Sequence, residues 1–188
     1  RVVPSLTGYG DGAVRGIGLT CAQPRQGGRI GASVPPNGGE VFGRAVAARC
    51  DTPGEVAVGL EVRAGSWIDG VKPLCGRLHP PAPRNRPWVD HPSGNPRTSL
   101  DCPADHRLTG IDVAYTDPHR KVMQVKRMRC TPMSALRAGN TTGSRIVQVA
   151  NVGTVEATAT DRNLRCPNGK QVVAFQGFND GSEMRRLG

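Results

Sequence analysis

Four aspartates near expected chain reversals are the carboxylates best placed to do chemistry in this sequence. Asp11, Asp117 and Asp180 each adjoin a Gly or Pro at a predicted hairpin tip, and Asp69 lies just beyond a fourth tip. Carboxylates on loops at one end of a fold can accept hydrogen bonds from sugar hydroxyls, and Trp88, in a proline-rich loop, offers a flat face for stacking. These residues predict a carbohydrate-binding surface. Asp beside Gly or Pro is also a common turn former, so a purely structural reading stays open.

Basic residues supply the second candidate site. The formal net charge is +10 and the pI about 10.1. One stretch of the sequence holds a dense cationic cluster: Arg120, Lys121, Lys126, Arg127 and Arg129. Such a cluster favours binding to acidic polysaccharides, although arginine can also serve only solubility. Aromatic residues, which single-stranded nucleic acid uses for stacking, are nearly absent from this stretch, so no specific nucleic acid partner is expected.

Sequence signals for catalysis and for metal binding are weak. The histidines His79, His91, His106 and His119 lie in expected loops or near turns, and no GxSxG or HExxH motif occurs. No pair of carboxylates can be assigned to glycoside hydrolysis from the sequence. The sequence therefore predicts a protein that is not an enzyme, with no cofactor and no metal site.

The elements that must position these residues are cysteine-flanked hairpins. Cys50 to Cys75 and Cys102 to Cys130 each run from a cysteine through a turn, an apolar-alternating segment, a break and a second segment to a closing cysteine. Counting back from the expected tips places residue 54 opposite Cys75 and residue 106 opposite Cys130. Half-repeats flank the two hairpins, one ending at Cys21 and the other starting at Cys166.

This count predicts how the six cysteines pair. Cys50–Cys75 and Cys102–Cys130 would close the two hairpins, because each pair has the same four-residue offset. Cys21 and Cys166 are left over and would join the two half-repeats. A serial pattern of 21–50, 75–102 and 130–166 stays open, because six cysteines allow 15 pairings.

Alternating apolar residues and the repeats predict an all-β fold. Val56, Val58, Leu60 and Val62 are expected on one face of a strand, and no amphipathic helix is evident. We expect one domain over residues 1–188, with repeats at about 1–21, 40–75, 96–130 and 145–188. Repeat spacings of 52 and 64 residues favour a threefold pseudo-symmetric β-prism over the alternative, a β-trefoil.

Two motifs resemble the repeat of the vitelline membrane outer layer protein family. The segment from Gly10 to Cys21 is similar to the part of that repeat in which a Gly-Asp turn leads to a cysteine, and Cys166-Pro167-Asn168-Gly169 is similar to its Cys-Pro-x-Gly entry. The resemblance implies a secreted β-prism with hairpin-closing disulfides. It also points to the related architecture of jacalin-type lectins, which bind sugars through loops at one end. The tryptophan-glycine-rich strand that precedes each cysteine in the family is missing here.

Cysteine usage and hydropathy predict a secreted protein. An even number of cysteines without metal-binding spacing indicates an oxidising compartment, and no run of 18 apolar residues occurs, so no membrane span is expected. We therefore expect a non-catalytic binding or structural module of an extracellular matrix, coat or cell envelope that recognises carbohydrate or acidic polysaccharide. Two alternatives stay open: a self-associating structural subunit, and a carbohydrate-active enzyme that transfers or hydrolyses glycosyl groups.

Overall fold

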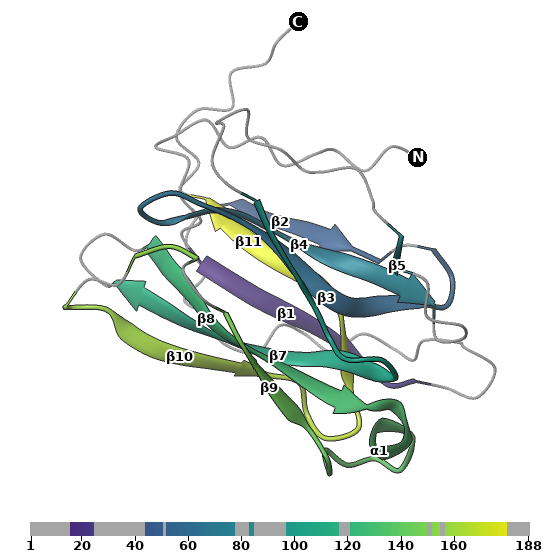
Figure 1. Cartoon of the computed structure of the whole chain (residues 1–188). Helices are drawn as coiled ribbons and strands as arrows, with labels where there is room; N and C mark the ends of the chain where they lie inside the picture. Colours follow the sequence, from purple (N-terminus) through teal and green to yellow (C-terminus); the bar gives the residue numbers. More distant parts are fainter. Residues whose placement is uncertain are drawn as a thin grey trace, which may run out of the picture.

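The computed structural model describes residues 16–24, 44–50, 52–77, 83–84, 97–116, 121–149, 152–154 and 157–179. Within them the chain forms strands and one short helix (Figure 1). The elements, in chain order, are β1 (Gly16–Ala22), β2 (Arg44–Arg49), β3 (Glu55–Ala64), β4 (Ile68–Arg77), β5 (Pro83–Arg84), β6 (Arg97–Asp101), β7 (His106–Thr116), β8 (Lys121–Pro132), α1 (Met133–Arg137), β9 (Arg145–Gln148), β10 (Thr160–Arg165) and β11 (Gln171–Asn179).

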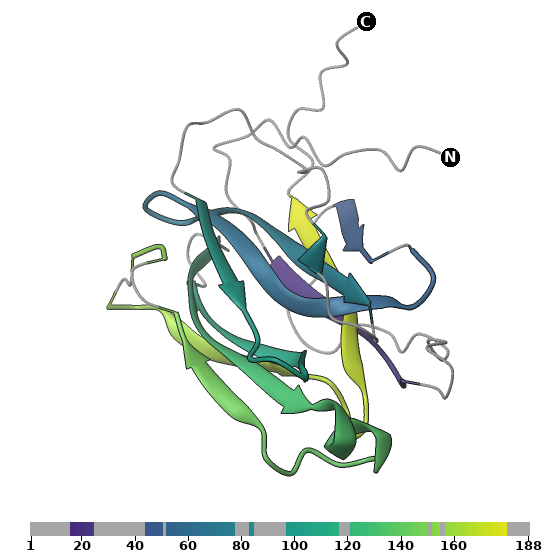
Figure 2. The ribbon, with the colours of Figure 1, turned by 45° about the vertical axis from the view of Figure 1, so that its right-hand side comes forward.

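Three antiparallel sheets share one strand plan. Their strand orders are β5-β4-β3-β6, which we call the β3–β4 sheet, β10-β7-β8-β9, the β7–β8 sheet, and β1-β11-β2, the terminal sheet. In each sheet the central strand follows the first cysteine of a disulfide pair. The strand on one side of it carries the second cysteine of that pair, and the strand on the other side belongs to the next repeat. Strands β3, β7 and β11 occupy this central place and contact one another (Figures 1 and 2). The all-β prediction is confirmed.

Three disulfides follow the predicted pairing. Cys50–Cys75 and Cys102–Cys130 close the two hairpins with Cα separations of 5.5 and 5.6 Å. Cys21–Cys166 joins the half-repeats at 5.7 Å, and β1 pairs antiparallel with β11. Because β1 and β11 form a backbone ladder with each other, the two half-repeats together make a third hairpin-like pair from opposite parts of the sequence.

A β-bulge recurs at the same point of each pair and links one sheet to the next. The extra residue is Val58 in β3, Thr109 in β7 and Val173 in β11, one position past the residue opposite the second cysteine. The backbone carbonyl of each bulged residue accepts a hydrogen bond from the N–H of another repeat's first cysteine. The bonds are Cys102 to Val58 at 2.8 Å, Cys166 to Thr109 at 2.8 Å and Cys50 to Val173 at 3.0 Å. Together with the disulfides of the same cysteines, the three bonds form a cycle that includes every sheet.

Each central strand also begins with the same tight turn. In each four-residue turn, the N–H of the fourth residue donates to the carbonyl of the first at 3.0 Å. The turns are residues 52–55, 103–106 and 167–170. The third residue of each turn has a positive φ, 82° at Gly54, 62° at Asp105 and 71° at Gly169. A positive φ at this position is typical of a type II turn, which explains the glycine in the Cys-Pro-x-Gly motif.

The main core collects one apolar residue from the same position of each central strand. Leu60, Ile111 and Phe175 are each at most 2% exposed and belong to one cluster, which also includes Leu19 and Met128. A smaller cluster forms around Val56, Val58, Leu74 and Met133. All three sheets thus contribute to the main core.

Two local predictions are wrong; a β-bulge explains the first, and the position of the hairpin turn explains the second. Val56 and Val58 pack in the smaller cluster, whereas Leu60 and Val62 pack in the main core, because the bulge shifts the alternation by one residue. The residue opposite Cys75 is Ala57 rather than residue 54, since the chain reverses over residues 65–67 and not at Ala64-Gly65.

In the second hairpin the residue opposite Cys130 is Leu108 rather than residue 106, again with bulges between. Helix α1 directly follows β8, and its Met133, Ala135 and Leu136 are buried. This helix is a single turn, too short to produce a helical period in the sequence. Between Arg145 and Arg165 the described chain forms two short strands, β9 and β10.

Candidate functional site

The predicted basic cluster lies on β8, in the β7–β8 sheet. Lys126, Arg127 and Arg129 are all partly buried members of this strand. Lys121 begins β8, but its side chain lies outside the described residues, as does the whole of Arg120. The structure thus brings together three of the five residues assigned to polyanion binding.

Strand register places four polar side chains in one row across the sheet. Asn163 on β10 lies opposite Asp112 on β7, Asp112 lies opposite Arg127 on β8, and Arg127 lies opposite Gln148 on β9. Ile111 and Val113, which flank Asp112 in sequence, belong to the main core. Because side chains alternate along a strand, the row lies on the opposite, outer face of the sheet. We call this surface the charged face.

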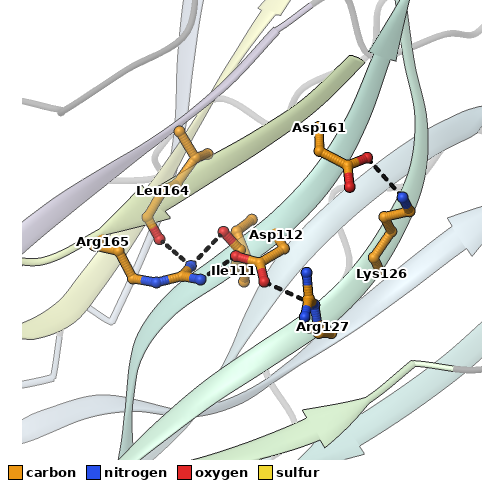
Figure 3. Close-up of polar contacts among 7 residues, drawn as sticks. All are labelled: Ile111, Asp112, Lys126, Arg127, Asp161, Leu164 and Arg165. Atoms are coloured by element: carbon orange, nitrogen blue, oxygen red, sulfur yellow. Dashed lines mark hydrogen bonds and ion pairs between the residues drawn. The ribbon is translucent and has the colours of Figure 1, made fainter. Parts of the chain in front are cut away.

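Asp112 is the centre of the charged face. Its side chain is only 4% exposed, and its Oδ2 accepts from Nε of Arg127 at 2.9 Å. Its Oδ1 pairs with Nη2 of Arg165 from β10. One buried carboxylate therefore orients two guanidinium groups that approach it from the two neighbouring strands (Figure 3).

Backbone carbonyls anchor Arg165 as well. Its Nη1 donates to the carbonyl oxygens of Ile111 at 2.9 Å and Leu164 at 3.0 Å (Figure 3). Gly110, directly opposite Arg165, leaves room for this arrangement. A Cβ at Gly110 would come within 2.8 Å of Cδ of Arg165 and 2.5 Å of the Leu164 carbonyl oxygen. A glycine at this register position is therefore needed for the arginine to lie across β7.

A second ion pair crosses β7 on the same face. Nζ of Lys126 lies 2.6 Å from Oδ1 of Asp161 on β10 (Figure 3). Both side chains are considerably more exposed than Asp112, at 31% and 47%. An exposed pair of this kind contributes little to stability, roughly 0–1 kcal/mol, but it sets the local charge.

Among the described residues, the charged face has a positive excess. It carries two carboxylates, those of Asp112 and Asp161, and four cationic side chains: Lys126, Arg127, Arg129 and Arg165. Arg129 lies two residues after Arg127 on β8, so its side chain is on the same face of the sheet. Its buried Nε has no hydrogen-bond acceptor within the described part of the chain. A buried donor without a partner is uncommon and often marks a place where water or an ion binds.

Arg127 has the geometry of an anion-binding group. Its side chain is 42% exposed, and Nε is the atom that bonds Asp112. The two terminal nitrogens have no acceptor among the described residues. A guanidinium in this state presents paired N–H donors whose spacing suits a carboxylate or a sulfate.

Of the predicted carbohydrate-binding residues, the structure describes Asp69 alone. Asp69 is partly buried at the start of β4. Asp11, Asp117, Asp180 and Trp88 lie outside the described residues. Among the residues that are described, no three His, Cys, Asp or Glu side chains form a group that could hold a metal ion.

A small pocket lies between β1 and the inner side of the β7–β8 sheet. Apolar side chains make most of its wall, among them Ile17, Val113 and Leu164, and Arg162 is its one charged lining residue in the described chain. Tyr115 also lines the pocket, and the described lining contains no carboxylate.

Sequence reasoning missed three charged residues of the charged face, Asp112, Asp161 and Arg165. Asp112 is an isolated acid in an apolar strand, and Arg165 lies 38 residues after Arg127 in the sequence. The alternation of residues 110–114 gave one signal, because it places Asp112 on the face away from the core. The position directly before each first cysteine is charged in all three repeats, at Arg49, Asp101 and Arg165. That recurrence was a usable hint.

No protein-family model, curated protein or solved structure matches this chain. Within the described residues, no helix has the length and apolar character needed to cross a membrane.

Proposed function

We propose that this protein is a secreted, non-catalytic binding module that recognises acidic polysaccharide through the charged face. The observation that carries the proposal is the buried carboxylate of Asp112 with Arg127 and Arg165 held on either side. Lys126 and Arg129 extend the positive surface along β8. A matrix, coat or cell envelope rich in carboxylated or sulfated glycans is the setting in which such a surface would act.

A closed threefold β-prism of the vitelline membrane outer layer type is the architecture that we propose for this module. The bonds of Cys50, Cys102 and Cys166 support it, because each of these cysteines donates its N–H to the central strand of one sheet and forms a disulfide with a strand of another. The pairing of β1 with β11 and the Cys21–Cys166 bond support it too, since they join the two ends of the repeat series. Three disulfides suit an oxidising, extracellular location.

Polysaccharide is a better partner for this face than single-stranded nucleic acid. The described residues of the charged face include no aromatic side chain on which bases could stack. Arginines arranged on a sheet instead suit repeated anionic groups along a polymer, and the interaction should weaken as salt increases.

Retention on immobilised heparin tests the proposal. Replacing Lys126, Arg127 and Arg129 with Ala should move elution to distinctly lower salt. The matched control replaces three exposed arginines away from the charged face, Arg137, Arg145 and Arg162, and makes the same change in net charge. Circular dichroism and a melting curve should show that both variants fold.

The two triple variants separate a defined surface from net charge. If the charged face is the contact surface, its variant elutes well before the control variant. Equal shifts in the two variants would mean that net charge alone causes retention, and the charged face would not be the binding site.

A further inference from the structure

We infer that Asp112, Arg127 and Arg165 form a preorganised subsite for a single oxyanion, a sulfate or carboxylate group of the polymer. In this subsite Asp112 is the positioning residue that holds the arginines ready. The inference rests on the proposed function and adds a counterintuitive element to it, since an acidic residue would strengthen the binding of an acidic ligand.

Burial separates Asp112 from an ordinary surface acid. Its side chain is only 4% exposed and pairs with both arginines, so the carboxylate offers a ligand little direct contact. One carboxylate neutralises one of two guanidinium groups, which leaves a positive charge at the cluster. The ligand would meet the exposed terminal nitrogens of Arg127 and the partly exposed side chain of Arg165, 29% accessible.

Preorganisation is the physical gain. A free arginine side chain samples many rotamers, and fixing it on binding opposes association. Here the bond from Nε of Arg127 to Asp112 and the two carbonyl bonds from Nη1 of Arg165 fix both side chains before a ligand arrives. A charge-assisted bond through Nε also orients the remaining N–H groups of Arg127 outward.

The equivalent positions of the other sheets show that the subsite is particular to the β7–β8 sheet. Glu61 and Lys72 occupy the same register in the β3–β4 sheet and form an ion pair at 2.7 Å. Both are buried there, at 9% and 6% exposure, so that pair cannot receive a polymer. In the terminal sheet the position holds Gln176 and Gly18, which carry no charge.

Arg129 extends the same argument. Arg129 and Arg165 lie on either side of Gly110 in one cross-strand row. Because Gly110 has no side chain, none stands between the two arginines. Their Cα atoms are two strand spacings apart, about 9.5 Å. The buried Nε of Arg129, which has no acceptor in the described chain, is a second donor that an anion or its water could satisfy.

The experiment compares Asp112→Asn with Asp161→Asn. Both variants remove one negative charge from the charged face, so a model of charge alone predicts tighter binding in both. Our inference predicts that Asp161→Asn binds more tightly, whereas Asp112→Asn binds about three to ten times more weakly, the effect of releasing one or two ordered side chains. The affinities should be measured by calorimetry at two salt concentrations, with dextran sulfate and polygalacturonate as the sulfated and carboxylated probes.

Arg127→Lys gives an independent test that does not depend on whether Asp112→Asn folds. Lysine keeps the positive charge but lacks both Nε and the planar fork. We expect it to weaken binding by a similar factor, whereas the control Arg162→Lys, away from the charged face, should bind like the wild type.

The outcomes separate the two proposals. At 0.15 M salt the Debye length is about 8 Å. If the wild-type protein binds neither probe at this salt concentration, the proposed function is wrong. If it binds but Asp112→Asn gains affinity as Asp161→Asn does, or Arg127→Lys binds like the wild type, the charged face attracts polymers without a subsite. Weaker binding of both Asp112→Asn and Arg127→Lys supports the subsite, and the stronger probe identifies the anionic group.

Discussion

Removing the Cys21–Cys166 disulfide should destabilise this protein more than removing either hairpin disulfide. The bond spans a sequence separation of 145, whereas Cys50–Cys75 and Cys102–Cys130 span 25 and 28. A cross-link that closes a longer loop removes more conformational entropy from the unfolded chain. We expect the double variant Cys21→Ala/Cys166→Ala to show this difference.

The magnitude follows from the loop lengths. In the chain-entropy model each hairpin bond contributes about 3.5 kcal/mol. Intact hairpin disulfides shorten the loop that Cys21–Cys166 closes in the unfolded chain. Subtracting their separations from 145 leaves an effective loop of about 90 residues. Such a loop corresponds to about 4.6 kcal/mol, roughly 1 kcal/mol more than either hairpin bond.

Urea unfolding of three double alanine variants, one for each disulfide, measures the differences. The free energy of unfolding should fall most for Cys21→Ala/Cys166→Ala, and hydrogen exchange should show β1 opening before the rest of the fold. Similar losses would be compatible with compensating changes in packing, but a clearly smaller loss than in either hairpin variant would refute the reasoning from loop entropy.

Three further changes test local features of the fold. Gly139→Ala, with a φ of 76° and open space at Cβ, should cost about 1 kcal/mol, whereas Gly169→Ala, whose Cβ would lie 2.8 Å from the Gly139 Cα, should cost clearly more in the same melting assay. Glu61→Gln should destabilise by about 3 kcal/mol, because it removes the carboxylate that pairs with the buried ammonium group of Lys72, and replacing both with Leu and Met should recover most of that loss in urea titrations. Gly110→Ala should weaken both stability and heparin retention, since its Cβ displaces Arg165; unchanged retention would separate Arg165 from binding.

Local signals in the sequence were sufficient for the hairpins and their cross-links. Cys50 and Cys75 bracket a segment with alternating apolar residues and a glycine at its break, and such patterns depend on neighbours a few residues away. The glycine at residue 169 similarly reflects a turn that needs a positive φ. The half-repeats could be matched because their motifs are the two parts of one unit.

Register could not be read in the same way. The bulge at Val58 adds one extra residue to β3, and it is stabilised by a hydrogen bond from the N–H of Cys102, which belongs to the next repeat. The bulge decides which face each later residue occupies, so Val56 and Leu60 pack in different clusters. Helix α1 is likewise a product of packing, since its buried Met133 joins the cluster of Val56 and Val58.

The candidate site divides along the same line. The positive charge of β8 can be read from the sequence, because Lys126, Arg127 and Arg129 are close together in the chain and no nearby acid cancels them. The position of Asp112 between Arg127 and Arg165 needs the folded chain, because this contact depends on the registers of two strand pairs and on the space above Gly110. Charge density is a property of composition, whereas the orientation of a guanidinium depends on which carboxylate the fold buries beside it.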